Sequence, residues 1–191
     1  MTTSLFRRAL TRAIRHIRRQ YYRTLSDNSP RLDLATHLQP ALLTGAGTIR
    51  LHRCTLGYFP SARYWDSYCH LEAREESAEI FVADGVFINN GATLVAERTS
   101  IRIDSDCLIG PSVQIYDSDF HALAPEERTG GTHSCAPVCV ERNVFVGASV
   151  IILKGVTIGH DSVIAAGSVV VHDIPPRSIA SGVPARVVRS L

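Results

Sequence analysis

The residue best suited to chemistry in this sequence is His121, which lies in the segment YDSDFHALAPEER. An imidazole has a pKa near neutrality, so it can act as a base toward a hydroxyl proton. Three nearby carboxylates, Asp117, Asp119 and Glu126, are candidates to orient the ring and favour its protonated form. The sequence does not choose among them. On the local sequence alone, His121 is more simply explained as a solvated loop residue.

Other residue types that often carry chemistry form no convincing group. The five cysteines are an odd number, and the closest two, Cys135 and Cys139, have a spacing that matches no zinc knuckle. A carbonic-anhydrase-type zinc site needs three histidines, yet positions 116 and 126 are not histidine and His133 is twelve residues from His121. We therefore expect reduced thiols, no metal site and a cytoplasmic protein.

The elements that must position His121 have a period of six residues. Val140, Val146, Ile152, Ile158, Ile164 and Val170 recur at this interval. A single helix would repeat its apolar face every 3.6 residues and a single strand every 2. A period of six instead predicts short strands joined by corners and stacked coil upon coil, with the aliphatic side chains pointing inward.

The same pattern divides the rest of the chain. It is weak from Leu43, absent over 57–79, where we expect distorted coils with a loop, and regular again from Val82 to Ile115 apart from a slip. Residues 117–137 form an irregular excursion, which is where function is usually built on a rigid scaffold. We expect a linker and cap over 27–42, a coil domain over 43–191, and a tail over 175–191 that caps the open end, since Pro175-Pro176 should prevent another paired coil.

The first segment, residues 1–26, differs from everything that follows. Residues 4–23 predict a helix with Phe6, Leu10, Ile14 and Ile17 on one face. Residues 1–25 carry seven arginines and no acid, so within a net charge of +2 the remaining residues sum to −5. This uneven charge disfavours nucleic acid as the main partner. Two alternatives remain: the apolar face packs on the protein's own body or a neighbouring subunit, or the helix lies peripherally on an anionic membrane. We favour the former.

The hexads, the excursion and the ending VTIGHDSVIAAGSVVVHDIPPRSIASGVPARVVR resemble the hexapeptide-repeat acyltransferases, in the branch of maltose/galactoside and polysaccharide O-acetyltransferases. The resemblance covers roughly residues 80–189. It implies an all-β fold, a left-handed parallel β-helix, here preceded by a basic amphipathic α-helix. It also implies a homotrimer with active sites between subunits and acetyl-CoA as the donor, with no metal.

The resemblance also implies roles for particular residues. His121 corresponds to the family's catalytic histidine, with one residue inserted before it. The acceptor-binding asparagine is Asn89 if the aliphatic residues are aligned, or Asn90 if residues are counted back from His121, and we favour Asn89. Glu97 falls where the family has an acceptor-binding aspartate. The donor groove maps to Ala148 and Ala166, with Arg186 and Arg189 near the adenosine, while Val171-His172 replaces a common Thr-Lys.

The expected function is O-acetyl transfer from acetyl-CoA to a hydroxyl of a sugar or cell-surface glycan precursor, with His121 as general base. A xenobiotic acetyltransferase is an alternative within this class. A non-catalytic coiled scaffold and a zinc carbonic-anhydrase-like enzyme are alternatives outside it, and both are disfavoured. The sequence does not identify the acceptor.

Overall fold

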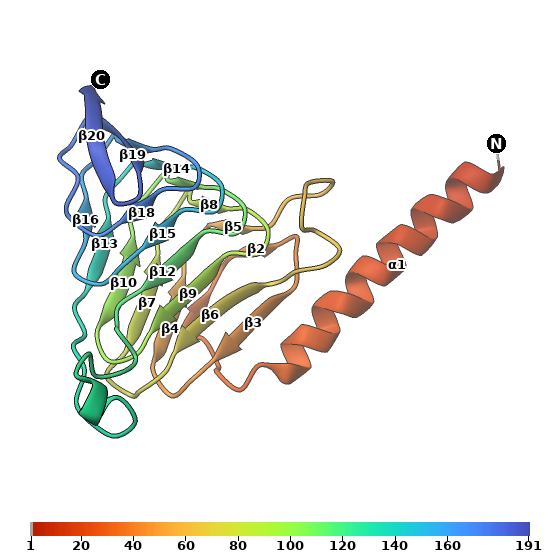
Figure 1. Cartoon of the computed structure of the whole chain (residues 1–191). Coiled ribbons are helices and arrows are strands. Elements are labelled where there is room, and N and C mark those ends of the chain that lie inside the picture. The colour runs from red at the N-terminus through yellow and green to blue at the C-terminus, as the bar shows by residue number, and fades with distance from the viewer. Residues whose placement is uncertain (1) are drawn as a thin grey trace.

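The computed structural model describes residues 2–191, with side chains from residue 5 onward, and shows one long helix followed by a stack of β-coils (Figure 1). Helix α1 spans Thr2–Leu25. Each coil contributes one strand to each of three sheets, here called sheets A, B and C. The coils wind as a left-handed parallel β-helix, so the predicted fold class is confirmed.

The strands are short and occur in the same order in every coil. Sheet A contains β1 (Leu32–Asp33), β4 (Thr48–Leu51), β7 (Glu79–Val82), β10 (Ser100–Ile103), β13 (Val138–Val140) and β16 (Thr157–Ile158). Sheet B contains β2 (Thr36–His37), β5 (Thr55–Leu56), β8 (Phe87–Ile88), β11 (Leu108–Ile109), β14 (Phe145–Val146), β17 (Val163–Ile164), β19 (Ser178–Gly182) and β20 (Ala185–Ser190). Sheet C contains β3 (Ala41–Thr44), β6 (Cys69–Ala73), β9 (Thr93–Ala96), β12 (Gln114–Tyr116), β15 (Ile151–Ile152) and β18 (Val169–Val170).

The six-residue period produces the core directly. In sheet B the register places one inward aliphatic of each coil on that of the next, and each is at most 1% exposed: Leu56, Ile88, Ile109, Val146 and Ile164. Burial of each such side chain contributes about 1.5–3 kcal/mol relative to its exposure. The stack therefore has one continuous apolar core.

The corner between sheets B and C, called the B–C corner, turns through residues with left-handed backbone conformations. Gly91, Ser112, Ser149 and Gly167 have φ values of 73°, 58°, 56° and 72° at equivalent points of successive coils. Small residues adopt this conformation at little steric cost. The corner between sheets C and A, called the C–A corner, carries the long excursion.

The structure differs from the expected boundaries at both ends of the stack. The first coil begins at Leu32, inside the expected linker, because β1 and β2 pair with β4 and β5. Of residues 57–79, only 57–68 leave the coil, since β6 and β7 are regular. After Pro175-Pro176, β19 still pairs in parallel with β17, so one further strand joins the stack beyond the prolines, but no complete coil with a strand in each sheet follows among the described residues. Both prolines precede β19, whose own N–H groups remain available; antiparallel β20 then pairs with β19.

Helix α1 docks on the 57–68 loop through arginines. Arg15 donates a hydrogen bond to the Tyr64 hydroxyl at 2.8 Å, and its guanidinium lies 4.5 Å from the ring centroid of Phe59. Arg18 donates to the carbonyl oxygens of Tyr64 and Ser67 at 2.7 and 3.0 Å. Figure 1 shows the C-terminal end of α1 beside β3 while its N-terminal end lies away from the coils.

The apolar stripe of α1 does not take part in this docking. Its large side chains are exposed by 40–71%: Phe6, Leu10, Ile14, Ile17 and Tyr21. At about 100° per residue, the stripe lies roughly a third of a turn around the helix from Arg15 and Arg18. Packing of the stripe on the chain's own body is therefore contradicted, because carbonyl oxygens and aromatic rings bind the arginine face instead. Among the described residues, no helix combines the length and apolar composition needed to cross a bilayer.

Candidate active site

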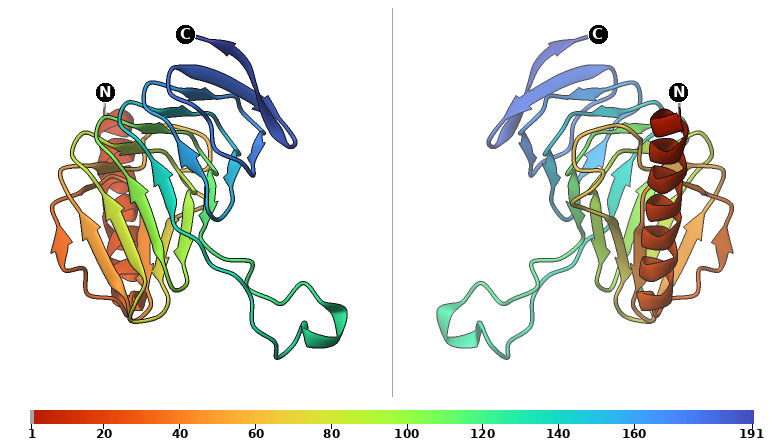
Figure 2. Two further views of the ribbon diagram at one scale, coloured as in Figure 1. Left: turned by 90° about the vertical axis from the view of Figure 1, so that its left-hand side faces the viewer. Right: turned by 90° about the vertical axis from the view of Figure 1, so that its right-hand side faces the viewer.

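The excursion at residues 117–137 leaves the stack at the C–A corner, between β12 and β13. Figure 2 shows it extending away from the coils, with a short 3₁₀ helix, Pro125–Glu127, in its outer part. Its two limbs are joined near the stack by an antiparallel bridge between Ser118 and Cys135. The excursion is called the catalytic-candidate loop below.

His121 is exposed on the outgoing limb of this loop, and the residue before it is held firmly. Phe120 has a φ of 62°, and its N–H donates to the Ser118 hydroxyl at 2.9 Å. Its ring lies edge-on to Tyr116, with centroids 5.7 Å apart, and the Arg74 guanidinium lies 4.9 Å from its centroid. The His121 imidazole has no hydrogen bond or ion pair within the described chain, so it is free to meet a group from outside.

None of the three nearby carboxylates orients His121 within one chain. Asp117 is fully buried and accepts hydrogen bonds from the N–H groups of Glu97 and Thr99 at 2.7 and 2.8 Å. Asp119 forms an ion pair with Lys154 at 3.1 Å. Glu126 is exposed in the 3₁₀ helix. Asp117 and Asp119 instead fix the root of the loop to the coils beneath and beyond it.

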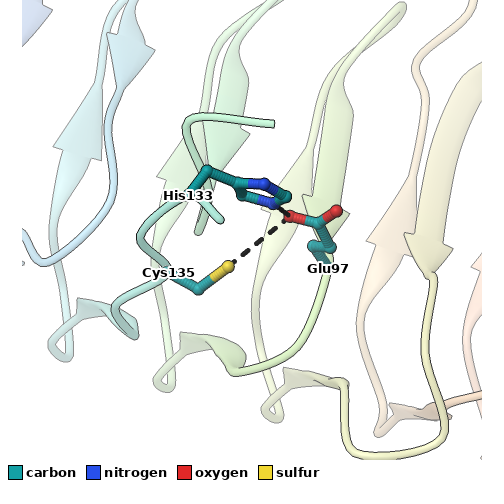
Figure 3. Close-up of side chains that lie close together, drawn as sticks. All are labelled: Glu97, His133 and Cys135. Carbon is teal, nitrogen blue, oxygen red and sulfur yellow. Dashed lines mark hydrogen bonds and ion pairs between the residues drawn. The ribbon is translucent and has the colours of Figure 1, made fainter. Parts of the chain in front are cut away.

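Glu97 lies at the C–A corner and joins both limbs of the loop. Its Oε2 accepts hydrogen bonds from the Ser118 hydroxyl and from His133 Nε2, the latter at 2.6 Å, and lies 3.5 Å from Cys135 Sγ (Figure 3). Its Oε1 lies 3.5 Å from an Arg74 nitrogen. Burial alone would raise the pKa of Glu97, but hydrogen bonds from Ser118, His133 and Cys135 lower it to about 2. Glu97 is therefore ionised near neutral pH.

The spacing of His133 and Cys135 matches none of the zinc patterns considered in the sequence, which predicts a role for neither residue. The positions of both depend on the path of the returning limb, which no local pattern encodes. The other thiols are different, because burial raises the pKa of Cys54 and Cys69 to about 12 and that of Cys107 to about 11. These three thiols are poor nucleophiles and poor ligands near neutral pH.

The two candidate asparagines have different surroundings. Asn90 is fully buried; its Oδ1 accepts from the N–H of Tyr58, and its Nδ2 donates to the carbonyls of Tyr58 and Ala62, all at 2.9 Å. Asn89 is half-buried, and its Oδ1 accepts from the N–H of Asn90 at 2.7 Å. The amide of Asn90 is thus fully used in holding the 57–68 loop, whereas the Asn89 Nδ2 has no partner within the described chain.

The residues expected to bind the donor form a column at the B–C corner. The coils approach closely there: a Cβ on Gly147 would lie 2.5 Å from the backbone nitrogen of Ala166, and one on Gly110 would lie 2.7 Å from that of Ala148. Arg186 lies above this column, opposite Ser181 in the β19–β20 register, whereas Arg189 pairs with Ile179 at the other end of β19. Backbone N–H groups and one cation therefore line one edge of the stack.

These groups occupy different corners of one chain. Asn89 follows β8 and precedes β9, which puts it at the B–C corner with Ala148 and Ala166. Glu97 and His121 belong to the C–A corner, from which the catalytic-candidate loop extends outward (Figure 2). A single chain thus separates its candidate base from its candidate donor groove.

A stack of six-residue coils with a histidine on an outward loop is typical of one class of proteins. Comparison with known proteins identifies that class. Residues 137–171 match the family model described as the hexapeptide repeat of succinyl-transferase. Nodulation protein L of Rhizobium meliloti (strain 1021) is 36% identical over 167 residues, which cover 78% of this chain and 87% of that protein. This chain belongs to the hexapeptide-repeat acetyltransferase family.

Two further relatives are similar over the coils. Galactoside O-acetyltransferase of Escherichia coli (strain K12) is 38% identical over 114 residues, 60% of this chain and 55% of that protein. A hexapeptide-repeat acetyltransferase of Vibrio cholerae aligns with 93% of this chain and 81% of its own, at 30% identity and a TM-score of 0.60. Its complex with acetyl coenzyme A aligns over 61% of each chain, at 40% identity and a TM-score of 0.55. The chain spans only 51–57% of the length of the first curated relatives it matches.

Proposed function

We propose that this protein is an acetyl-CoA-dependent O-acetyltransferase whose acceptor is a hydroxyl of a sugar or glycan. The observation that carries the proposal is an exposed histidine on an anchored loop, combined with the column of backbone groups at the B–C corner of the same stack. Relatives include a galactoside O-acetyltransferase and an acetyltransferase solved with acetyl coenzyme A. The three fully buried thiols with raised pKa, Cys54, Cys69 and Cys107, are unsuited to carry an acetyl group, and the unpaired imidazole favours direct transfer.

In the proposed mechanism His121 acts as the general base. One imidazole nitrogen takes the proton of the acceptor hydroxyl while its oxygen attacks the thioester carbonyl carbon. The tetrahedral intermediate collapses as the carbon–sulfur bond breaks, and the imidazolium returns the proton to the sulfur of CoA. Backbone N–H groups of the alanine column would stabilise the oxyanion, and Arg186 would contact the phosphates of CoA.

The site is proposed to form between subunits of a homotrimer. Asn89, Ala148 and Ala166 lie at one corner and His121 at another, so two chains are needed to complete one site. Asn89, with its free amide nitrogen, is the proposed acceptor contact. The carboxylate of Glu97 is occupied by the loop here, so its predicted contact with the acceptor remains a prediction that would require it to leave His133.

The apolar stripe of α1 is proposed to rest on an anionic lipid surface. The rest of the described chain does not cover this stripe, and the first helical turns carry Arg7, Arg8 and Arg12 with no acid. Exposed aliphatics beside arginines are typical of helices that lie in the membrane interface. Each such arginine contributes about 1 kcal/mol near an anionic surface.

Release of the CoA thiol tests the central proposal. Wild-type protein is expected to release CoA from acetyl-CoA only when a suitable sugar or glycan acceptor is supplied. His121→Ala should lower the rate by about 10²–10⁴-fold. His52→Ala is the matched control, because His52 precedes the corner between sheets A and B, away from both the loop and the groove. Equal turnover by wild type and His121→Ala would refute the mechanism.

A further inference from the structure

Glu97, His133 and Cys135 form a group with the chemistry of a metal site. One carboxylate oxygen, one imidazole nitrogen and one sulfur all lie within 4.8 Å of one another (Figure 3). They come from two separate segments, the coil corner after β9 and the returning limb of the loop. The acetyl transfer proposed above uses neither His133 nor Cys135, so the group needs another explanation.

The spacing of the three atoms is close to that of a tetrahedral site. Zinc binds oxygen and nitrogen ligands at about 2.0–2.2 Å and sulfur at about 2.3 Å, which puts ligand atoms roughly 3.3–3.6 Å apart. Glu97 Oε2 already lies 3.5 Å from Cys135 Sγ, and it lies 2.6 Å from His133 Nε2. The oxygen–nitrogen pair must separate by about 1 Å, and the His133 nitrogen, which lies at most 4.8 Å from Cys135 Sγ, must come to rest about 3.6 Å from it; a rotation of the His133 side chain would have to supply both changes.

Metal binding requires the release of protons, because His133 Nε2 and the Cys135 thiol both donate hydrogen bonds to Glu97 Oε2. The imidazole would keep its proton on Nδ1 and present Nε2 to the ion, and the thiol would lose its proton to solvent. Arg98 donates from Nε to Cys135 Sγ at 3.3 Å, which holds the sulfur beside Glu97. The same arginine holds the His133 carbonyl at 3.0 Å, which fixes the backbone of this limb. Arg98 and Arg74 oppose a cation by their charge, and the two anionic ligands must outweigh that repulsion.

The chemical nature of the three ligand atoms determines which metal ion they bind best. A thiolate, an imidazole and a carboxylate together suit Zn²⁺ better than the hard cations Mg²⁺ and Ca²⁺, which prefer oxygen ligands alone. The Ser118 hydroxyl, which already contacts Glu97 Oε2, or a water molecule would take the fourth position.

We propose that Glu97, His133 and Cys135 bind one Zn²⁺ per chain and that the ion fixes the returning limb of the catalytic-candidate loop to the coil stack. The ion takes no part in acetyl transfer. It replaces a network of hydrogen bonds by ligand bonds, and so restricts the loop that carries His121.

Direct metal binding tests this proposal separately from any enzymatic activity. Full-length protein, reduced with a non-thiol reagent, competes with a chromophoric indicator for Zn²⁺. The expected result is one ion per chain with micromolar or tighter affinity. Cys135→Ser and His133→Asn should each weaken binding by about 100-fold or more, since loss of an outer-shell partner alone costs 10–100-fold. Cys139→Ser, a half-buried thiol outside the group, should bind as wild type does.

Co²⁺ provides a spectroscopic readout of the ligands. Wild type and Cys139→Ser should give a thiolate-to-cobalt charge-transfer band that Cys135→Ser lacks. Circular dichroism verifies that each variant is folded. Zinc should also slow tryptic cleavage after Arg128, which is exposed in the loop. Absence of micromolar binding, equal affinity in Cys135→Ser and wild type, or cleavage that zinc does not slow would each overturn the proposal and leave a hydrogen-bonded loop anchor.

Discussion

The carboxylate of Asp117 accepts two hydrogen bonds from Thr99, one from its backbone N–H and one from its hydroxyl, each at 2.8 Å. Asp117 is the first residue of the catalytic-candidate loop, and Thr99 lies in the corner one coil below. A fully buried carboxylate thus serves as the anchor for an exposed loop. The contact also explains why an acid close to His121 in sequence does not act on His121 itself.

Asp117→Ala should therefore loosen the loop. The N–H groups of Glu97 and Thr99 would lose their acceptor, and each unsatisfied buried donor costs about 1–3 kcal/mol. We expect a fall of about 3 kcal/mol in the free energy of unfolding and faster proteolysis of residues 117–137. Urea unfolding and limited digestion measure the two effects. Glu76→Ala, at an exposed site whose side chain makes no hydrogen bond within the described part of the chain, should change neither. An Asp117→Ala protein as stable as wild type would contradict this role.

The two asparagines at the B–C corner should separate binding from stability. Asn89→Ala is expected to raise the KM for the acceptor by about 10-fold, which corresponds to the loss of one hydrogen bond, without changing the KM for acetyl-CoA. It also removes the acceptor of the Asn90 N–H, so the free energy of unfolding should fall by about 1 kcal/mol. Asn90→Ala should lower the unfolding free energy more, by about 2 kcal/mol, because it removes the three hydrogen bonds by which the buried amide holds Tyr58 and Ala62. Steady-state kinetics measures the acceptor KM of each variant, and thermal unfolding measures its stability. The reverse assignment would hold if only Asn90→Ala raised the acceptor KM while remaining fully stable.

Glu97 should make the protein sensitive to acid. Its pKa is lowered from 4.5 to about 2 in the folded state, so its stabilising effect is complete above about pH 4.5 and is lost as the pH falls toward 2. The unfolding free energy of wild type should exceed that of Glu97→Gln at pH 6, and the difference should shrink as the pH is lowered through 4. Urea titrations across this range provide the measurement. A difference that stays constant with pH would show that the Glu97 carboxylate is not held by the loop.

The stripe of α1 should bind anionic vesicles. Full-length protein is expected to sediment with phosphatidylserine-containing vesicles at low salt, and less so at high salt, where arginine charges are screened. The triple variant Leu10→Ser, Ile14→Ser, Ile17→Ser should lose binding while retaining wild-type stability, because these side chains are exposed in the chain. Deletion of residues 1–25 should also abolish sedimentation.

If a neighbouring subunit covers the apolar stripe of α1 instead of lipid, the opposite results are expected. Both changes to α1 would then lower thermal stability or break the oligomer, and the intact protein would ignore the vesicles. Full-length protein that does not sediment with anionic vesicles at low salt would refute the lipid proposal.

The regular coils could be predicted because their residues repeat. Ile152, Ile158 and Ile164 each occupy an equivalent buried position, and a period of six is incompatible with a single helix or strand. The first coil could not be recognised in this way, because Asp33 and His37 stand where the next coil has the inward Leu51 and Leu56. The sequence likewise predicted the exposed loop and its histidine, because the repeat stops there.

Local sequence patterns did not predict the contacts between segments that are distant in the chain. Amphipathicity predicted that the apolar face of α1 would meet protein, yet Arg15 and Arg18 make the contact because the 57–68 loop presents carbonyl oxygens and aromatic rings. The grouping of Glu97 with His133 and Cys135 depends on how the loop returns across 36 and 38 residues of chain. Such pairings follow from tertiary geometry alone.

The division of candidate groups between the B–C and C–A corners has a genetic consequence. In the proposed trimer, each site takes His121 from one subunit and Asn89 from the next, as a cyclic head-to-tail interface allows. Two defective alleles, one encoding His121→Ala and the other Asn89→Ala, should therefore complement each other when co-expressed. Every mixed trimer would contain one site in which both residues are wild type. Neither allele alone could supply such a site.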